Sequence, residues 1–322
     1  MNAGGSEGAS SDSRPKVTLG ELAEVNGLGA GRAILTQWAA IGLAAAVAIW
    51  CGQWWSYLPA IVVIATRQHA LLVLMHDGAH RLLARRRFVN DLASDLFLAF
   101  PLFVSTTLYR NHHFLHHRFL NSDADPDVAD SRESHTRVGW LLVFLADIGG
   151  RGFMKVLRSG SDFSMLSFLT GGDRERRLVP AWQFVSFAAF WIAVAVSLTL
   201  LDGWIQFLLL WVLPMFTVLS LILHVRAVAE HAGCDSVPTI GGTRTVIPGV
   251  LERLLFAPVN VNYHLAHHLF PGVPGTKLGQ LHARLCEDDR FGREAHVTRG
   301  YFLGKRSVLA EIAVDGVGSR AR

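Results

Sequence analysis

Cysteine is scarce in this sequence: the 322 residues include three, Cys51, Cys234 and Cys286. They lie far apart and form no CxxC pair, which excludes a disulfide framework and a thiolate metal site. Charged residues are also few, at 17% of the chain, and the net charge of +4 is too small to indicate a nucleic-acid partner. No P-loop or GxGxxG accompanies a strand–helix pattern, so no bound nucleotide is predicted.

The first 30 residues lack an apolar run and a signal-peptide pattern. They are rich in Gly, Ser, Ala and charged residues, a composition that predicts a disordered cytosolic tail. Residues 31–310 are predicted to form one membrane domain, and residues 311–322 a C-terminal tail.

Apolar residues are abundant instead, at 51% of the chain with a mean hydropathy of +0.31, which favours a membrane protein. A helix needs about 20 apolar residues to cross a bilayer. Four segments approach this length: residues 33–50, 57–75, 180–201 and 204–225. The predicted fold class is therefore an all-α integral membrane protein with four transmembrane helices.

Very short turns, at residues 51–53 and 202–203, join these segments into two pairs. Such turns predict helical hairpins, and both ends of a hairpin lie on the same side of the membrane. Basic runs at residues 85–87 and 174–177 flank those ends, so the positive-inside rule makes that side cytoplasmic. Trp204, beside the second turn, suits the opposite interface. The expected location is a bacterial cell membrane.

Two further apolar runs do not fit a full crossing. Residues 92–108 are interrupted by Pro101, and residues 138–148 are too short to span. Both are interpreted as re-entrant or interfacial helices.

Histidine is concentrated in three groups that follow or flank apolar segments. HxxxH ends the second span, and two copies of HxxHH follow later, with one more histidine shortly after the fourth span. Residues at i, i+3 and i+4 share one face of a helix, and imidazole suits Fe, Zn, Cu and Ni. Nine nitrogens are too many for one ion and suit two. The nine candidate ligands are His76, His80, His113, His116, His117, His231, His264, His267 and His268.

The metal hypothesis also constrains the topology. If residues 92–108 crossed the membrane completely, the first two histidine groups would face opposite sides and could not share metal ions. The re-entrant interpretation of this segment therefore depends on a shared site.

The motifs HDGAH (76–80), HHFLHH (112–117) and HLAHH (264–268) resemble those of the membrane fatty-acid desaturase family, which includes hydroxylases. The resemblance implies four spanning helices with a cytosolic histidine-rich cap and two iron ions. It also implies a fatty-acyl or other lipid substrate, and an external electron donor, ferredoxin or cytochrome b5 with its reductase. The segment 224–231 looks like the family's source of one extra ligand, assigned to His231. Many relatives have a polar or acidic residue where this chain has Ala266.

Three functions remain open at this point. An O2-dependent desaturase that introduces a C=C bond is the first, and a hydroxylase of the same fold on an alkyl or lipid-like substrate is the second. Both use the same ligands, so the motifs do not separate them. A metal transporter is the third, but transport sites usually lie near the bilayer midplane, whereas these histidines lie outside the four spans.

Several residues are candidates for a supporting role. His69, seven residues before His76, shares its helix face about 10 Å deeper. Arg67 lies within the second span, where a charge is costly. It is a candidate for the substrate cavity, with Asp95 as a possible partner. The candidates to support the ligands are His112, His69, His224, Glu230 and Asn262.

Asp123, Asp125 and Asp127 form a DxDxD pattern after the second histidine group. Pro126 and the absence of the central Gly and closing Glu argue against a calcium loop, and the pattern is interpreted as a turn or a helix-start cluster. Three isolated histidines are expected at the surface: His135, His282 and His296.

Overall fold

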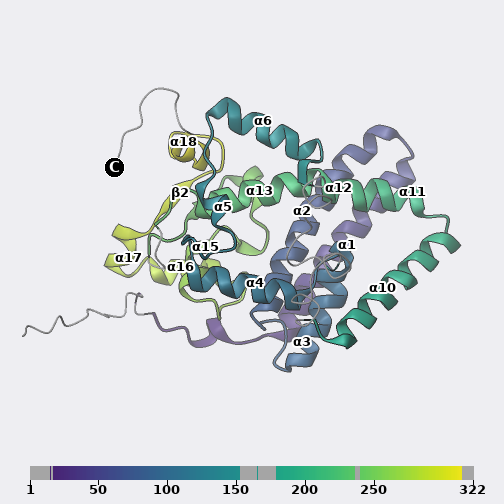
Figure 1. Ribbon diagram of the computed structural model, residues 1–322, viewed down its shortest axis with the longest axis horizontal. Helices are drawn as coiled ribbons and strands as arrows, with labels where there is room; N and C mark the ends of the chain where they lie inside the picture. The colour runs from purple at the N-terminus through teal and green to yellow at the C-terminus, as the bar shows by residue number, and fades with distance from the viewer. Residues whose placement is uncertain (1–14, 16, 153–164, 166–178, 236–239, 314–322) are drawn as a thin grey trace, which may run out of the picture.

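The computed structural model describes residue 15 and residues 17–152, 165, 179–235 and 240–313. Its architecture is mostly helical, with four helices long and apolar enough to cross a membrane. Figure 1 shows them on one side of the molecule, with the short helices of the C-terminal half on the other. The four are α1 (Gly27–Cys51), α2 (Trp54–Ala79), α10 (Ala181–Leu200) and the continuous run α11 to α13 (Trp204–His231).

Local signals define the first two long helices. The side chain of Asn26 accepts a hydrogen bond from the Gly29 N–H and caps the start of α1. Gly52 ends α1 in the left-handed conformation, at φ 65°, which glycine adopts without steric cost. α2 begins two residues later, and the two helices pack through a core that includes Ile41, Ile64 and Leu71.

The fourth long helix is irregular. It comprises α11 (Trp204–Phe207), the π-turn η4 (Leu208–Val212), α12 (Leu213–Phe216) and α13 (Val218–His231). Pro214 has no N–H to donate to the preceding turn, which accounts for the distortion there. Beyond a kink at Thr217, α13 buries Leu219 and Ile222 against Ala65 of α2. It ends at His231, so packing along the span determines where this histidine lies.

Residues 92–108 do not form a continuous span. They include parts of α3 (Arg87–Ser94) and α4 (Thr106–Phe119), separated by the π-turn η2 (Asp95–Ala99) and the 3-10 turn η3 (Phe100–Leu102). Phe103 has a positive φ of 60°, and Ser105 then caps α4 by accepting from the Leu108 N–H. α4 returns to the end of α2, as the re-entrant interpretation requires.

Short elements make up most of the rest of the described chain. The first two are α5 (Val128–Arg132) and α6 (Arg137–Ile148). α6 buries Trp140 but exposes Leu141, Leu142 and Leu145, as expected of an interfacial helix. The later elements are β1 (Thr245–Ile247), α14 (Val250–Phe256), η5 (Pro258–Asn260), α15 (His264–Leu269), η6 (Gly275–Lys277), α16 (Leu278–Leu285), α17 (Asp289–Glu294), β2 (Val297–Arg299) and α18 (Val308–Ile312).

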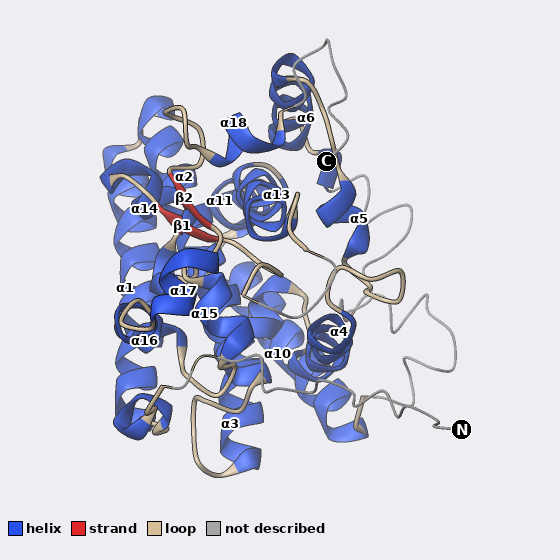
Figure 2. Ribbon diagram, turned by 90° about the vertical axis from the view of Figure 1, so that its left-hand side faces the viewer, coloured by secondary structure: helices blue, strands red, loops and turns tan. Residues whose placement is uncertain are grey.

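The strands β1 and β2 pair in parallel, an addition to the predicted all-α fold (Figure 2). Beside them, α15 is held by a core in which Leu265, Leu281, Leu285 and Phe291 are fully buried. Leu22 joins the same core from η1 (Gly20–Ala23), and α1 begins at Gly27, so ordered elements start within the predicted tail of residues 1–30. Residues 1–14 and 314–322 lie outside the described residues.

Candidate metal centre

The first two histidines extend from the end of α2, which is held by side chains of neighbouring helices. Arg110 donates to the carbonyls of Ala79 (Nε, 2.7 Å) and Gly78 (Nη2, 3.1 Å). Asn90 donates to the Gly78 carbonyl as well. These contacts satisfy carbonyls that a helix end leaves unpaired. A Cβ atom on Gly78 would overlap the side chain of Ser94, so the close packing of α3 here requires glycine.

Nine histidines form two clusters. Within each cluster, the ligating nitrogens all lie within 4.8 Å of one another. The cluster of five comprises His76, His80, His113, His117 and His267. The cluster of four comprises His116, His231, His264 and His268.

Each HxxHH motif supplies both clusters. On α4, His113 and His117 (i, i+4) belong to the cluster of five, and His116 belongs to the cluster of four. On α15 the division is reversed, because His264 and His268 belong to the cluster of four and His267 to the cluster of five. Adjacent residues of a helix point about 100° apart, so the consecutive histidines of each motif diverge. Stacking of His117 on His268, with ring centroids 4.2 Å apart, places the two clusters side by side.

The nitrogens fit a bound cation better than a hydrogen-bonded network. Nε2 of His117 lies 2.9 Å from Nε2 of His113 and 3.0 Å from Nε2 of His267, and His113 also lies 3.0 Å from His80. An Nε2 atom has either one proton to donate or one lone pair that accepts. It therefore cannot form good hydrogen bonds with two neighbouring Nε2 atoms at once. Among the described residues, the buried Nε2 of His76 has no hydrogen-bond partner. A cation would accept all of these lone pairs.

Burial keeps the imidazoles neutral. Desolvation lowers the pKa of His80 to about 4 and that of His117 to about 3. It also lowers the pKa values of His264, His267 and His268. Neutral imidazole is the form that binds a metal ion.

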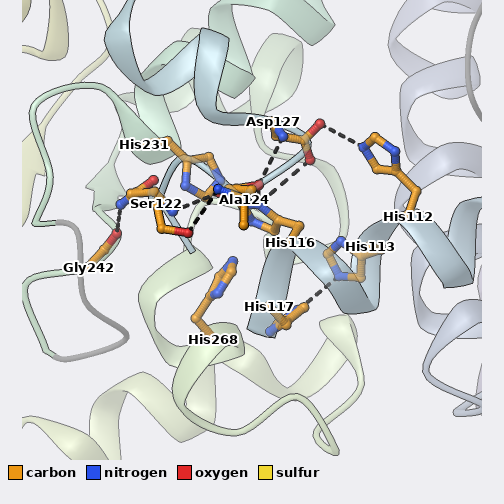
Figure 3. A network of polar contacts seen from close by, with 12 residues as sticks. His112, His113, His116, His117, Ser122, Ala124, Asp127, His231, Gly242 and His268 are labelled. Carbon is orange, nitrogen blue, oxygen red and sulfur yellow. Dashed lines mark hydrogen bonds and ion pairs between the residues drawn. The ribbon is translucent and has the colours of Figure 1, made fainter. Parts of the chain in front are cut away.

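A carboxylate that the sequence did not assign to the site orients one of these rings. Asp125 is buried, and its two oxygens lie 2.9 and 3.1 Å from Nδ1 of His116. The backbone N–H groups of Asn121 and Asp127 donate to the same carboxylate. Figure 3 shows this network around His116. The DxDxD pattern therefore forms a turn, as predicted, and also supports a ligand.

Three of the candidate supporting residues lie near the clusters. Nε2 of His112 bonds Asp127 at 2.8 Å, and Asp127 lies 3.7 Å from Nδ1 of His116 (Figure 3). Glu230 pairs with Arg226 at 2.7 Å, and its other oxygen lies 3.6 Å from Nδ1 of His264. Asn262 donates to the Val246 carbonyl at 2.9 Å and joins β1 to the start of α15.

His224 and Arg67 do not face the clusters. His224 bonds Glu133 and Asp147, each at 2.7 Å, and so joins α13 to α6. Arg67 lies on the opposite face of α2 from His76, because nine residues correspond to two and a half turns. It donates to Gln37 of α1 at 3.0 Å.

The possible Arg67–Asp95 pair is not formed. Asp95 instead accepts from the Thr106 N–H at 3.1 Å and from the Gln183 side chain. His69 is fully buried, and among the described residues neither ring nitrogen has a hydrogen-bond partner. It does not belong to either cluster.

Each of the three isolated histidines contacts another side chain. His135 bonds Glu133, and His296 bonds Glu311 at 3.0 Å. His282 is partly buried against Tyr263. All three side chains are half-buried, so these histidines lie at the surface, as expected, with a neighbour on one side.

Comparison with known proteins adds to the geometry. A family model described as "Fatty acid desaturase" matches residues 52–299, which include all nine clustered histidines. The chain belongs to the fatty acid desaturase family. It is therefore an oxidoreductase of the desaturase type, and its four apolar helices are those of a membrane protein.

Two curated relatives of this desaturase have different substrates in their names. Dihydrorhizobitoxine desaturase of Bradyrhizobium elkanii is 27% identical over 290 residues, covering 85% of this chain and 81% of the relative. The sn-1 oleoyl-lipid 12-desaturase of Anabaena variabilis is 26% identical over 276 residues, covering 76% of this chain and 75% of the relative. Both are named desaturases, so the comparison supports the reaction class more firmly than any one substrate.

Proposed function

We propose that this protein is an O2-dependent di-iron desaturase that introduces a C=C bond into a fatty-acyl or other lipid-like substrate. The observation that carries the proposal is the division of nine histidines, six buried and three half-buried, into clusters of five and four nitrogens. The family comparison supports iron among the metals that imidazole binds, and the oleoyl-lipid relative supports an acyl substrate.

The histidines would hold two iron ions, and the bound iron would activate O2. His76, His80 and the other members of the cluster of five would hold one ion, and the cluster of four the other. Removal of two hydrogens from the substrate and reduction of O2 to two waters need two further electrons and two protons. A ferredoxin or a cytochrome b5-type protein with its reductase would supply these electrons. The site would face the cytoplasm, where basic residues flank the long helices.

The protein's own residues would position the ligands and exclude water. Arg110 and Asn90 hold the end of α2, Asp125 orients His116, and the core around Leu265 holds α15. Such rigid support keeps the ligands in one geometry.

The test is mass spectrometry of lipids from cells that express the wild-type chain or the His267→Ala variant. We expect a product two mass units lighter than its precursor in the wild type and none in the variant. A product sixteen mass units heavier would identify a hydroxylase instead. Metal uptake into the cells without O2 consumption would identify a transporter.

A further inference from the structure

A small cavity opens beside the histidine clusters, between α4 and α13. Its volume is about 140 Å³, and its wall includes His113, His116, His231 and His264. Its other lining residues are mainly polar or charged: Tyr109, His112, Asp127, Arg226 and Glu230, with the apolar Leu223 and Ala227.

The size and lining of this cavity limit what it can bind. Pockets for drug-sized ligands usually measure about 300–1,000 Å³. A cavity of 140 Å³ whose wall includes Arg226, Glu230 and Asp127 has room for a small group with a polar end and not for a long alkyl chain. Whatever occupies it lies next to members of both clusters.

Arg226 is the cation in this wall. Its Nε donates to Glu230 at 2.7 Å, one helical turn away on α13. A guanidinium has five N–H donors, and the described residues give Arg226 no other hydrogen-bond partner. Its terminal nitrogens can therefore donate hydrogen bonds to a second carboxylate. A planar guanidinium matches the two oxygens of a carboxylate with two parallel hydrogen bonds.

The charge of the loaded site favours an anion there. Nine neutral histidines contribute no negative charge to balance two divalent iron ions. Those ions, together with Arg226, outweigh the nearby carboxyl groups of Asp77, Asp125, Asp127 and Glu230. An anionic ligand in the cavity would lower this excess of positive charge.

We propose that the cavity is a substrate subsite in which Arg226 binds a carboxylate of the substrate. Arg226 precedes His231 by five residues, a rise of about 7.5 Å along α13. A carboxylate bound by Arg226 would therefore lie close to the metal ligands, and the carbons attacked there would be within a few bonds of it. The substrate class is a free carboxylic acid attacked near its polar end. This inference rests on the proposed function, since it defines the substrate of the same site.

The experiment measures binding to the purified, iron-loaded protein by isothermal titration. The probes are butanoate and butanamide, which have similar shape but differ in charge. We expect the wild type to bind butanoate at least about tenfold more tightly than butanamide. Arg226→Gln should remove this preference, and Arg226→Lys should keep part of it, because it retains the charge but not the planar geometry.

The matched control is Arg290→Gln on α17. Like Arg226, Arg290 pairs with a glutamate four residues later, Glu294, but it is exposed and lies outside the cavity. It should leave the preference for butanoate unchanged. Iron content, measured for each variant, reports whether the site is intact. If Arg226→Gln does not fold, Ala227→Leu narrows the cavity without removing the ion pair and should weaken butanoate binding at least about tenfold.

Equal binding of the two probes by the wild type would overturn the inference. An unchanged preference in Arg226→Gln would also overturn it, since butanoate would then be bound by the iron or elsewhere. These results separate the two proposals. Lipid desaturation without a preference for butanoate rejects only the subsite, and a preference without any desaturation rejects only the proposed function.

Discussion

Nδ1 of His116 donates a hydrogen bond to the buried carboxylate of Asp125, 2.9 Å away. This contact determines which nitrogen is protonated, so that the Nε2 lone pair of His116 is available to the cluster of four. Asp125 is itself held by backbone N–H groups of its own turn. The loop after α4 thus acts on the site through the side chain of Asp125, and that of Asp127 lies 3.7 Å from the same nitrogen.

Asp125→Asn should weaken iron binding at the cluster of four by about 10–100-fold, the usual effect of losing a partner that orients a ligand. The amide has one acceptor oxygen where the carboxylate has two, and it does not stabilise the imidazole by charge. Iron per protein, measured by mass spectrometry during titration with a chelator, should fall toward one ion at a chelator concentration that leaves the wild type loaded. Asp123→Asn changes an exposed residue that pairs only with Arg132 among the described residues and should behave as wild type. Equal iron retention in the two variants would show that Asp125 does not support the ligand.

Removing single ligands should affect the two iron positions unequally. His267→Ala leaves four histidines in its cluster, whereas His116→Ala leaves three. Both should abolish turnover, but His116→Ala should lose more iron, because three nitrogens hold an ion less tightly than four. Iron content and O2 consumption of membrane-inserted protein measure this difference. His135→Ala, which alters a histidine outside both clusters, should keep both ions. Retained turnover in either ligand variant would reject that residue as a ligand.

The i, i+3 and i+4 spacings, which are local to a helix, predicted the eight motif histidines that the structure brings together. His231, the ninth, was assigned from the resemblance to the desaturase family. The division of the nine between two clusters was not predictable in the same way. It depends on how α4 and α15 face each other, as in the stacking of His117 on His268. The four long helices were likewise evident from apolar length, and the structure bounds them within four residues of the prediction, except that α1 begins six residues earlier, at Gly27, and α13 ends six residues later, at His231.

Side-chain partners were the least predictable part of the site. Asp125 was interpreted as a turn residue, and its carboxylate does accept a backbone N–H of its own turn. The same sequence pattern contains no signal for its second contact, with His116. His224 shares a helix face with His231, yet Asp147 of α6 and Glu133 at the end of α5 give it two carboxylates to bond. Such choices depend on tertiary neighbours that a single sequence does not reveal.

Arg110→Met should destabilise the folded protein by about 3 kcal/mol, the order expected when one partner of a buried ion pair is removed. The variant would leave Asp91 without its cation and the Ala79 carbonyl without its side-chain donor, whereas Asn90 would still donate to the Gly78 carbonyl. The unfolding temperature in detergent, followed by tryptophan fluorescence, should fall by several degrees. Arg118→Met, on the exposed face of the same helix, should change it little. Equal unfolding temperatures for the two variants would contradict a role of Arg110 in holding α2.

His296 should make the stability of the protein depend on pH above neutrality. Hydrogen bonds to Cys234 and Glu311 raise the pKa of His296 to about 9, whereas an unfolded histidine titrates near 6.5. The folded state therefore binds the proton more tightly. Its contribution is fully present below about pH 6.5 and is lost as the pH rises through 9. Because His296 is partly exposed, solvent screening limits the effect to the order of 1 kcal/mol.

The measurement is the unfolding temperature of the wild type and of His296→Gln between pH 6 and 10. The difference between them should be largest at the acidic end and should disappear toward the alkaline end, because only the wild type loses a charged contact with Glu311 as the proton leaves. His135→Gln provides the control for replacing a partly buried histidine that also bonds a carboxylate. A difference between wild type and His296→Gln that stays constant across this range would show that His296 is neutral in the folded protein. Arg244, which lies 3.2 Å from Glu311, would then provide the only cation in that contact among the described residues.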